Sequence, residues 1–171
     1  ALEQEYAVFI RELLPEAQLS AAEAILDQSF TLIQAQFVPT FSMQGVKIIL
    51  AQGELMATQL FQLYLQSIGQ ESVLLPALDF MRTNTSGEPD MPFIQRQLSL
   101  LLEAYAGQEL FITQGYICRN ADGDIDNLQR GGSDYTATLI GAAVQADEIQ
   151  IWTDIDGLHN NDPRVVAETQ P

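Results

Sequence analysis

Strands and helices are expected to alternate along the second half of the chain, and this order restricts the fold more than any other sequence feature. Short apolar runs bounded by turn residues predict buried strands, and longer segments with apolar residues three and four apart predict helices. The expected elements alternate through 72–77, 92–106, 109–118, 133–146 and 148–153. Such alternation is typical of α/β folds. We therefore expect a three-layer α/β/α fold with a largely parallel central sheet.

Helices are expected before this alternation begins. Residues 2–14 carry apolar residues at helical spacing, and Pro15 ends that helix because its ring cannot continue one. Ser20, with Glu23 three residues later, has the pattern of a capping box and predicts a second helix over 21–37.

Three polar, glycine-marked loops are expected at one edge of the predicted sheet. They follow the apolar runs that end near residues 50, 118 and 153, and a helix over 55–68 follows the first loop, Gln52-Gly53-Glu54. In parallel α/β folds, ligands bind at the carboxyl ends of strands, where loops lead into helices. We therefore expect the functional site at this edge.

The acidic stretch that begins at Asn120 does not fit a calcium site. An EF-hand loop requires Gly at its sixth position and Glu at its twelfth, but counting from Asn120 these positions hold Ile125 and Gly131. The Asp122-Gly123 pair instead predicts the turn of a β-hairpin.

The net charge of the chain excludes two classes of partner. Its 23 acidic and seven basic residues give a formal charge of −16, which repels nucleic acids and anionic membranes. No apolar run reaches the roughly 18 residues that span a bilayer, and the first residues do not resemble a secretory signal. Because Cys118 is the single cysteine and His159 the single histidine, we expect a cytoplasmic protein without a disulfide or a zinc site.

Residues 130–134, Arg-Gly-Gly-Ser-Asp, stand at the start of a predicted helix and have the features of an anion site. Unpaired backbone N–H groups and the helix dipole favour a carboxylate or phosphate there, and glycines let a ligand approach the backbone. Arg130 adds a two-pronged donor, while Arg82 and Arg164 are the other candidate counter-charges in polar segments. The alternative is that the glycines form only a turn and that Ser133 is only the helix N-cap. The classical P-loop is excluded, because no Gly-Lys-Ser or Gly-Lys-Thr sequence occurs.

Several motifs follow one another in a characteristic order. They are QGEL at 52–55, MRTN at 81–84, FITQGY at 111–116, RGGSDYTATLIGAA from 130, and then IWTDIDG and NDPRVV. Together they resemble the aspartokinase branch of the amino-acid kinase family. The resemblance covers about 47–166, whereas 1–40 is a helical segment without a diagnostic motif. It implies ATP-dependent phosphorylation of the side-chain carboxylate of L-aspartate to 4-phospho-L-aspartate, with Mg²⁺, at the start of lysine, threonine and methionine synthesis.

The resemblance also implies a role for each site residue. Glu54 would pair with the amino group of aspartate, and Arg130 would clamp a substrate carboxylate. Asp134 would be the catalytic residue that organises the phosphate and the magnesium ion. The substrate-binding motif covers Arg130, Gly131, Gly132 and Ser133. The nucleotide-binding motifs cover Thr153, Asp154, His159, Asp162 and Arg164. Since the accepting carboxylate is ionised at pH 7, this chemistry needs no general base.

Two departures from the family pattern bear on activity. The family opens with a Lys-Phe-Gly-Gly-Thr-Ser segment whose lysine stabilises the transferred phosphoryl group, and this sequence lacks that segment. Relatives usually carry Tyr where His159 stands. We expect an internal fragment of the kinase domain, truncated at both ends and without measurable activity by itself, from a full-length protein that is a homo-oligomer.

Three alternatives stay open on the sequence. The first is the kinase portion of a bifunctional aspartokinase–homoserine dehydrogenase, the second is part of another amino-acid kinase, and the third is a non-catalytic binding or assembly module. The position of Glu54 relative to Arg130 separates an amino-acid site from the last of these, because such a site needs both residues at one cleft.

Overall fold

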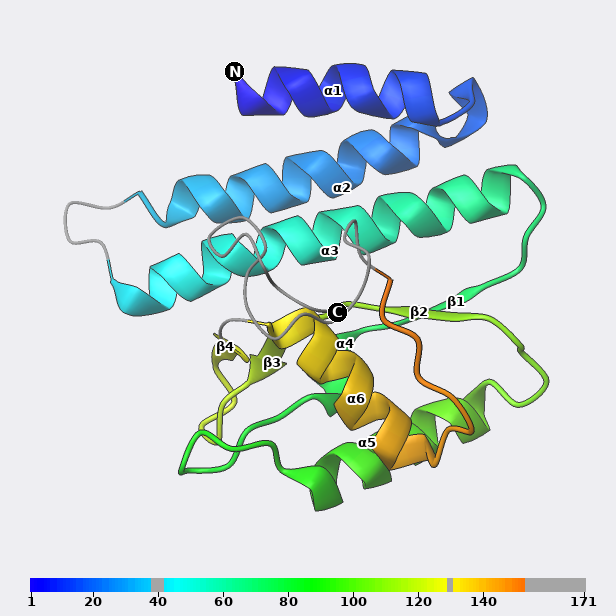
Figure 1. Cartoon of the computed structure of the whole chain (residues 1–171). Helices are drawn as coiled ribbons and strands as arrows, with labels where there is room; N and C mark the ends of the chain where they lie inside the picture. The colour runs from blue at the N-terminus through cyan, green and yellow to red at the C-terminus, as the bar shows by residue number, and fades with distance from the viewer. Residues whose placement is uncertain (38–41, 129–130, 153–171) are drawn as a thin grey trace, which may run out of the picture.

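Helices cover both faces of the short strands (Figure 1). The structure, a computed structural model of the chain, describes residues 1–37, 42–128 and 131–152. The elements in these ranges are α1 (Leu2–Leu13), α2 (Glu16–Ala35), α3 (Met43–Ser67), β1 (Val73–Leu75), α4 (Ala77–Phe80), α5 (Met91–Ala104), β2 (Phe111–Thr113), β3 (Ile117–Arg119), β4 (Ile125–Asn127) and α6 (Gly132–Val144). In Figure 1, α1, α2 and α3 lie above the strands, and α5 and α6 lie below them. The predicted α/β class is therefore confirmed.

The first two helices follow the prediction except at the start of α2. Helix α1 ends at Leu13, shortly before Pro15, as expected. Helix α2 begins at Glu16 with Pro15 as its N-cap residue, so the predicted cap at Ser20 is wrong and that residue lies inside the helix. The fixed φ of Pro15 leads directly into a helix, and the acidic Glu16 in the first turn interacts favourably with the helix dipole. None of the helices in the described ranges is long and apolar enough to cross a membrane.

Helix α3 is continuous across a segment that the sequence predicted as a loop. Its N-terminus is capped by Ser42, whose hydroxyl accepts a hydrogen bond from the N–H of Gly45 at 2.9 Å. The expected break at Gln52-Gly53-Glu54 is wrong, since the helix runs through it to Ser67. A glycine inside a helix costs about 1 kcal/mol, and packing of α3 against two apolar clusters outweighs that cost. Glu54 is therefore held on a rigid helix.

The strands form two small sheets within the described residues. β1 and β2 pair in parallel, with Leu74 opposite Ile112, whereas β3 and β4 form an antiparallel hairpin. The predicted turn at Asp122-Gly123 is confirmed, and Gly123 adopts φ 90°. The single strand predicted over 109–118 is divided into β2 and β3, and 148–152, also predicted as a strand, does not form one. The described residues thus contain one parallel pair and one hairpin, where the sequence predicted a single largely parallel sheet.

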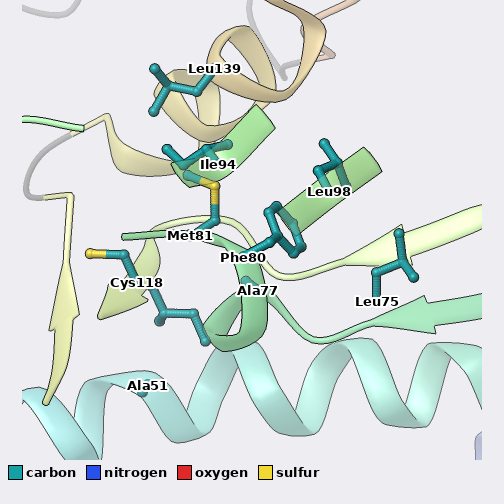
Figure 2. Packing of buried hydrophobic residues seen from close by; sticks show 10 residues of the cluster. Ala51, Leu75, Ala77, Phe80, Met81, Ile94, Leu98, Cys118 and Leu139 are labelled. Carbon is teal, nitrogen blue, oxygen red and sulfur yellow. The ribbon is translucent and has the colours of Figure 1, made fainter. Parts of the chain in front are cut away.

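An apolar core joins α3 to the helices on the opposite side of the strands (Figure 2). Phe80, Ile94 and Cys118 are completely buried in it. Burial raises the pKa of the Cys118 thiol to about 12, and the negative charge of Asp126 adds to this rise. The thiol is therefore protonated and unreactive in the native protein. A second apolar cluster holds α1 and α2 against α3 and consists of Ile10, Leu14, Ala22, Leu26, Phe30, Met56 and Leu60.

We expect Phe80→Ala to lower the free energy of unfolding by about 3 to 5 kcal/mol, because it removes a fully buried ring and leaves a cavity in the first cluster. The matched control is Phe61→Ala on α3, where the ring is 49% exposed and the loss is expected to be about 1 kcal/mol or less. Urea unfolding followed by circular dichroism measures both values. Equal losses in the two variants would contradict the position of the core.

Candidate functional site

A cavity of about 490 Å³ lies between α3, the segment that follows β2, and α6. Glu54 of α3 and Ser133 of α6 both line it, although they are far apart in the sequence. Gln114 and Gly115, which directly follow β2, form the wall between them. The rest of the lining comes mainly from apolar residues of α6 and of the segment after it, among them Ile140, Val144 and Ile149. The cavity therefore combines polar groups from three elements with an apolar extension.

Glu54 brings an uncompensated carboxylate to this cavity. It is partly buried, and burial raises the pKa of its side chain above the ordinary value for Glu. Within the described ranges, no ion pair or side-chain hydrogen bond engages its carboxylate. A partly buried negative charge without a partner is unfavourable, so a bound cationic group would relieve the cost of burying it.

The start of α6 brings backbone N–H groups to the region of Ser133. Gly131 is the N-cap residue and adopts the left-handed conformation at φ 73°, which glycine accommodates without strain. The N–H of Tyr135 donates to the carbonyl of Gly131 at 2.9 Å and so begins the helical hydrogen-bond pattern. The N–H groups of Gly132, Ser133 and Asp134 precede that bond, in the positions that bind anions at helix N-termini. The alternative in which Ser133 is only the helix N-cap is wrong, because Gly131 is the N-cap residue and Ser133 lies inside the first turn.

Two glycines allow the segment after β2 to pack directly against the first turn of α6. A Cβ atom on Gly115 would lie 2.9 Å from the Cβ and Oγ of Ser133, and one on Gly132 would lie 2.7 Å from the ring of Tyr116. Both distances are shorter than side chains tolerate. Tyr116 adopts φ 67° in the segment that separates β2, which ends at Thr113, from β3. A glycine beside a strand often marks the close approach of another group, and the group that approaches Gly115 is Ser133.

The hydroxyl of Thr136 fixes this contact from inside α6. It accepts a hydrogen bond from the N–H of Tyr116 at 3.1 Å and donates one to the carbonyl of Gly132 at 2.6 Å. Thr136 is 2% exposed, so both bonds are shielded from water. The position of the α6 N-terminus relative to β2 is therefore set by hydrogen bonds as well as by close packing.

The other predicted site residues fall into two groups. Asp134 is exposed in the first turn of α6 and does not line the cavity. Arg82 forms an ion pair with Asp90, and its guanidinium lies 3.7 Å above the ring of Phe93, so it bridges its own loop. This ion pair lowers the pKa of Asp90. The residues that lie outside the described ranges are Arg130, Thr153, Asp154, His159, Asp162 and Arg164.

Two polar residues of the cavity wall were not predicted. Gln114 is 1% exposed and makes two side-chain hydrogen bonds. The hydroxyl oxygen of Thr113 is buried without a hydrogen-bond partner. Both belong to the FITQGY motif at 111–116, which served only as a family landmark in the sequence. No group of three His, Cys, Asp or Glu side chains that could hold a metal ion occurs in the part of the chain that the structure describes.

We expect Glu54→Gln to raise the free energy of unfolding at pH 8 by a few tenths of a kcal/mol to about 1 kcal/mol. The pKa of Glu54 is raised in the folded state, so the charged form is destabilising at a pH above both the folded and the unfolded pKa values. The difference from the wild type is expected to shrink as the pH falls towards the unfolded value.

Urea unfolding at pH 8 and at pH 5 tests this dependence, with Glu103→Gln on the exposed side of α5 as the control. The control is expected to change stability by less than about 0.5 kcal/mol at either pH. A Glu54→Gln variant that is less stable than the wild type at pH 8 would show that the carboxylate has a favourable partner.

Comparisons with known proteins agree with this arrangement. The model described as "Amino acid kinase family" matches residues 7–171. The chain is 33% identical to lysine-sensitive aspartokinase 3 of Escherichia coli over 166 residues. The matched region covers 95% of this chain and 37% of that protein. It is 32% identical to bifunctional aspartokinase/homoserine dehydrogenase 2 of the same organism over 126 residues. That match covers 70% of this chain and 15% of that protein.

Solved structures give the same result at the level of the fold. The crystal structure of Escherichia coli aspartokinase III in complex with aspartate and ADP is similar with a TM-score of 0.80 and 33% identity, over 94% of this chain and 37% of that one. The structure of the same enzyme with lysine and aspartate has a TM-score of 0.75. The chain thus spans somewhat more than a third of the length of Escherichia coli aspartokinase III and 15% of the bifunctional enzyme. By its sequence motifs, its fold and these similarities, the chain belongs to the amino acid kinase family.

Proposed function

We propose that the protein that carries this chain is an aspartokinase, which transfers the γ-phosphoryl group of ATP to the side-chain carboxylate of L-aspartate. The observation that supports this most directly is the meeting of Glu54 and the first turn of α6 at one cavity. The similar Escherichia coli aspartokinase III has been crystallised with aspartate and ADP. The alternative of a non-catalytic binding module stays open, because Arg130, whose position relative to Glu54 separates the two, lies outside the described residues.

The polar end of the cavity suits an amino acid with an acidic side chain. In our proposal, Glu54 receives the ammonium group of aspartate, because its partly buried carboxylate has no cationic partner in the described residues. Arg130, Gly131, Gly132 and Ser133 would receive a carboxylate, since backbone N–H groups at a helix N-terminus and a guanidinium both favour anions. Two anchors of opposite sign would thus orient the substrate.

ATP and Mg²⁺ complete the proposed reaction. Mg²⁺ is usually held by one or two carboxylates together with substrate phosphates, and the exposed Asp134 at the start of α6 fits that requirement. Phosphoryl transfer depends mainly on positioning and on neutralisation of charge, which these groups would supply. We assign the nucleotide contacts to Thr153, Asp154, His159, Asp162 and Arg164, on the resemblance of their motifs to those of the family.

The proposal also covers the complete fold of the domain, the pathway that uses the product, the cell compartment and the oligomeric state. The parallel β1–β2 pair, with α3 on one face and α5 and α6 on the other, supports a three-layer domain around a larger, mostly parallel sheet. The 4-phospho-L-aspartate would enter lysine, threonine and methionine synthesis in the cytoplasm, and the full-length protein would be a homo-oligomer. The same kinase site is proposed whether or not a homoserine dehydrogenase domain accompanies it, as it does in the similar bifunctional enzyme.

We expect the full-length protein that carries this sequence to form an acyl phosphate from L-aspartate and ATP. Trapping the product with hydroxylamine, which gives a coloured hydroxamate, measures the rate. The 171-residue chain serves as a control that is expected to give no product, because it lacks the lysine-bearing opening motif. Product formed with L-glutamate but not with L-aspartate would contradict the proposed substrate.

We also expect Glu54→Gln and Arg130→Ala to raise the KM for aspartate at least about tenfold in the full-length protein, since each removes one charged anchor of the substrate. The KM for ATP should change little. Because Glu54→Gln is expected to leave the fold intact or more stable, its effect can be separated from unfolding by circular dichroism. An unchanged KM for aspartate in either variant would remove that residue from the proposed site.

A further inference from the structure

We infer that Gln114, together with Gly115, is a positioning residue that sets the separation between Glu54 and the first turn of α6. This inference rests on the proposed function, because it assigns to the pair the spacing of the two anchors for one amino acid. Gln114 and Gly115 are adjacent in the chain. The side chain of the first reaches towards α3, and the backbone of the second lies against α6.

The contact with α3 is a chain of hydrogen bonds that ends at Glu54. The side-chain Nε2 of Gln114 donates to the hydroxyl oxygen of Thr58 at 2.7 Å. The hydroxyl of Thr58 in turn donates to the backbone carbonyl of Glu54 at 2.8 Å. The turn of α3 that carries the proposed ammonium-binding carboxylate is thus tied to the end of β2.

The orientation of the Gln114 amide is fixed by a third bond. Its Oε1 accepts from the backbone N–H of Ala77 at 2.8 Å, and only the oxygen of the amide can accept there. The nitrogen must therefore face Thr58. At 1% exposure the side chain is shielded from water, so losing either partner would leave a buried polar group unsatisfied.

The contact with α6 is steric. There is no room for a Cβ atom on Gly115 beside Ser133. The first turn of α6 therefore packs directly against the backbone of the segment after β2. An amino acid bound between Glu54 and Ser133 spans a distance that these two contacts determine. A change of about 1 Å in that distance would misplace the substrate and weaken its binding strongly.

A purely structural role for Gln114 would have a different consequence. Loss of a structural hydrogen bond would destabilise the domain and affect both substrates alike. The positioning role instead predicts a selective effect on the amino acid, and above all on the discrimination between amino acids whose acidic side chains differ in length.

The test uses the full-length protein that carries this sequence and two near-isosteric substitutions. Gln114→Met removes the amide, and Thr58→Val removes the hydroxyl at the other end of the same bond. We expect each to raise the KM for aspartate about tenfold or more, to leave the KM for ATP within about twofold, and to lower the ratio of kcat/KM for L-aspartate over L-glutamate. Thr58→Ser keeps the hydroxyl and should restore the wild-type KM to within about threefold.

The matched control is Gln59→Met. Gln59 lies beside Thr58 on α3, but its amide donates to the carbonyl of Leu55 within the same helix. It should leave all three parameters unchanged. Equal rises in both KM values, a fall in kcat alone, or failure of Thr58→Ser to restore binding would overturn the positioning role.

A second measurement separates failure of this inference from failure of the proposed function. Carbon NMR of the Glu54 carboxyl group in the 171-residue chain reports its titration without any catalytic activity. We expect Gln114→Met to move the pKa of Glu54 towards the ordinary value, because the turn is released towards solvent. An unchanged titration would refute the link between Gln114 and Glu54. A wild-type protein that does not phosphorylate aspartate would refute the proposed function and leave that link standing.

Discussion

The close contact between the segment after β2 and the first turn of α6 is the constraint on which the rest of the candidate site depends. It exists because Gly115 and Gly132 lack side chains, and because Thr136 satisfies polar groups of both elements at once. A Cβ atom at either glycine would lie less than 3.0 Å from its neighbour, so a larger residue would force one of the two elements to shift. With this contact in place, the first turn of α6 lies beside the end of a strand, which is where ligands bind in α/β folds.

Helix α3 brings the opposite charge to this position. Its packing against two apolar clusters makes it a rigid support, and Glu54 stands on the part of its surface that faces the cavity. The raised pKa of Glu54 shows that its negative charge is held at a cost in the absence of a ligand. Such a cost is common at binding sites, because the fold supplies a charge that only the ligand neutralises. The carboxylate of the proposed substrate is already a nucleophile, so the protein mainly has to position it and neutralise charge.

The sequence predicted the helices and strands of the second half of the chain better than their boundaries and connections. The helices around Ile94 and Thr136, the strand around Leu74 and the hairpin turn at Gly123 all follow from local patterns, because spacing and turn chemistry act over a few residues. The boundaries and connections of the elements were less predictable. The polar segment at Gly53 has the composition of a loop, but tertiary packing keeps it helical.

Two further errors have the same origin. Ser20 has the pattern of a helix cap, yet α2 begins at Glu16 after Pro15, so Ser20 lies inside the helix and caps nothing. The expected strand over 109–118 was divided into β2 and β3 by a segment that packs against α6, and nothing in an apolar run shows that a distant helix will pack against it. Gln114 was overlooked for the same reason, since its two side-chain partners, Thr58 and Ala77, lie on segments remote in the sequence.

What the sequence determined by itself is the chemistry: a glycine-rich helix start with a neighbouring arginine, a series of motifs in family order, and a formal net charge of −16. What only the tertiary structure decided is which of these groups act together. Glu54 and Ser133 share a cavity because Gln114 and Gly115 connect the helices that carry them. Hydrogen bonds and close packing between remote segments depend on the distances that folding creates, and no local pattern of residues specifies those distances.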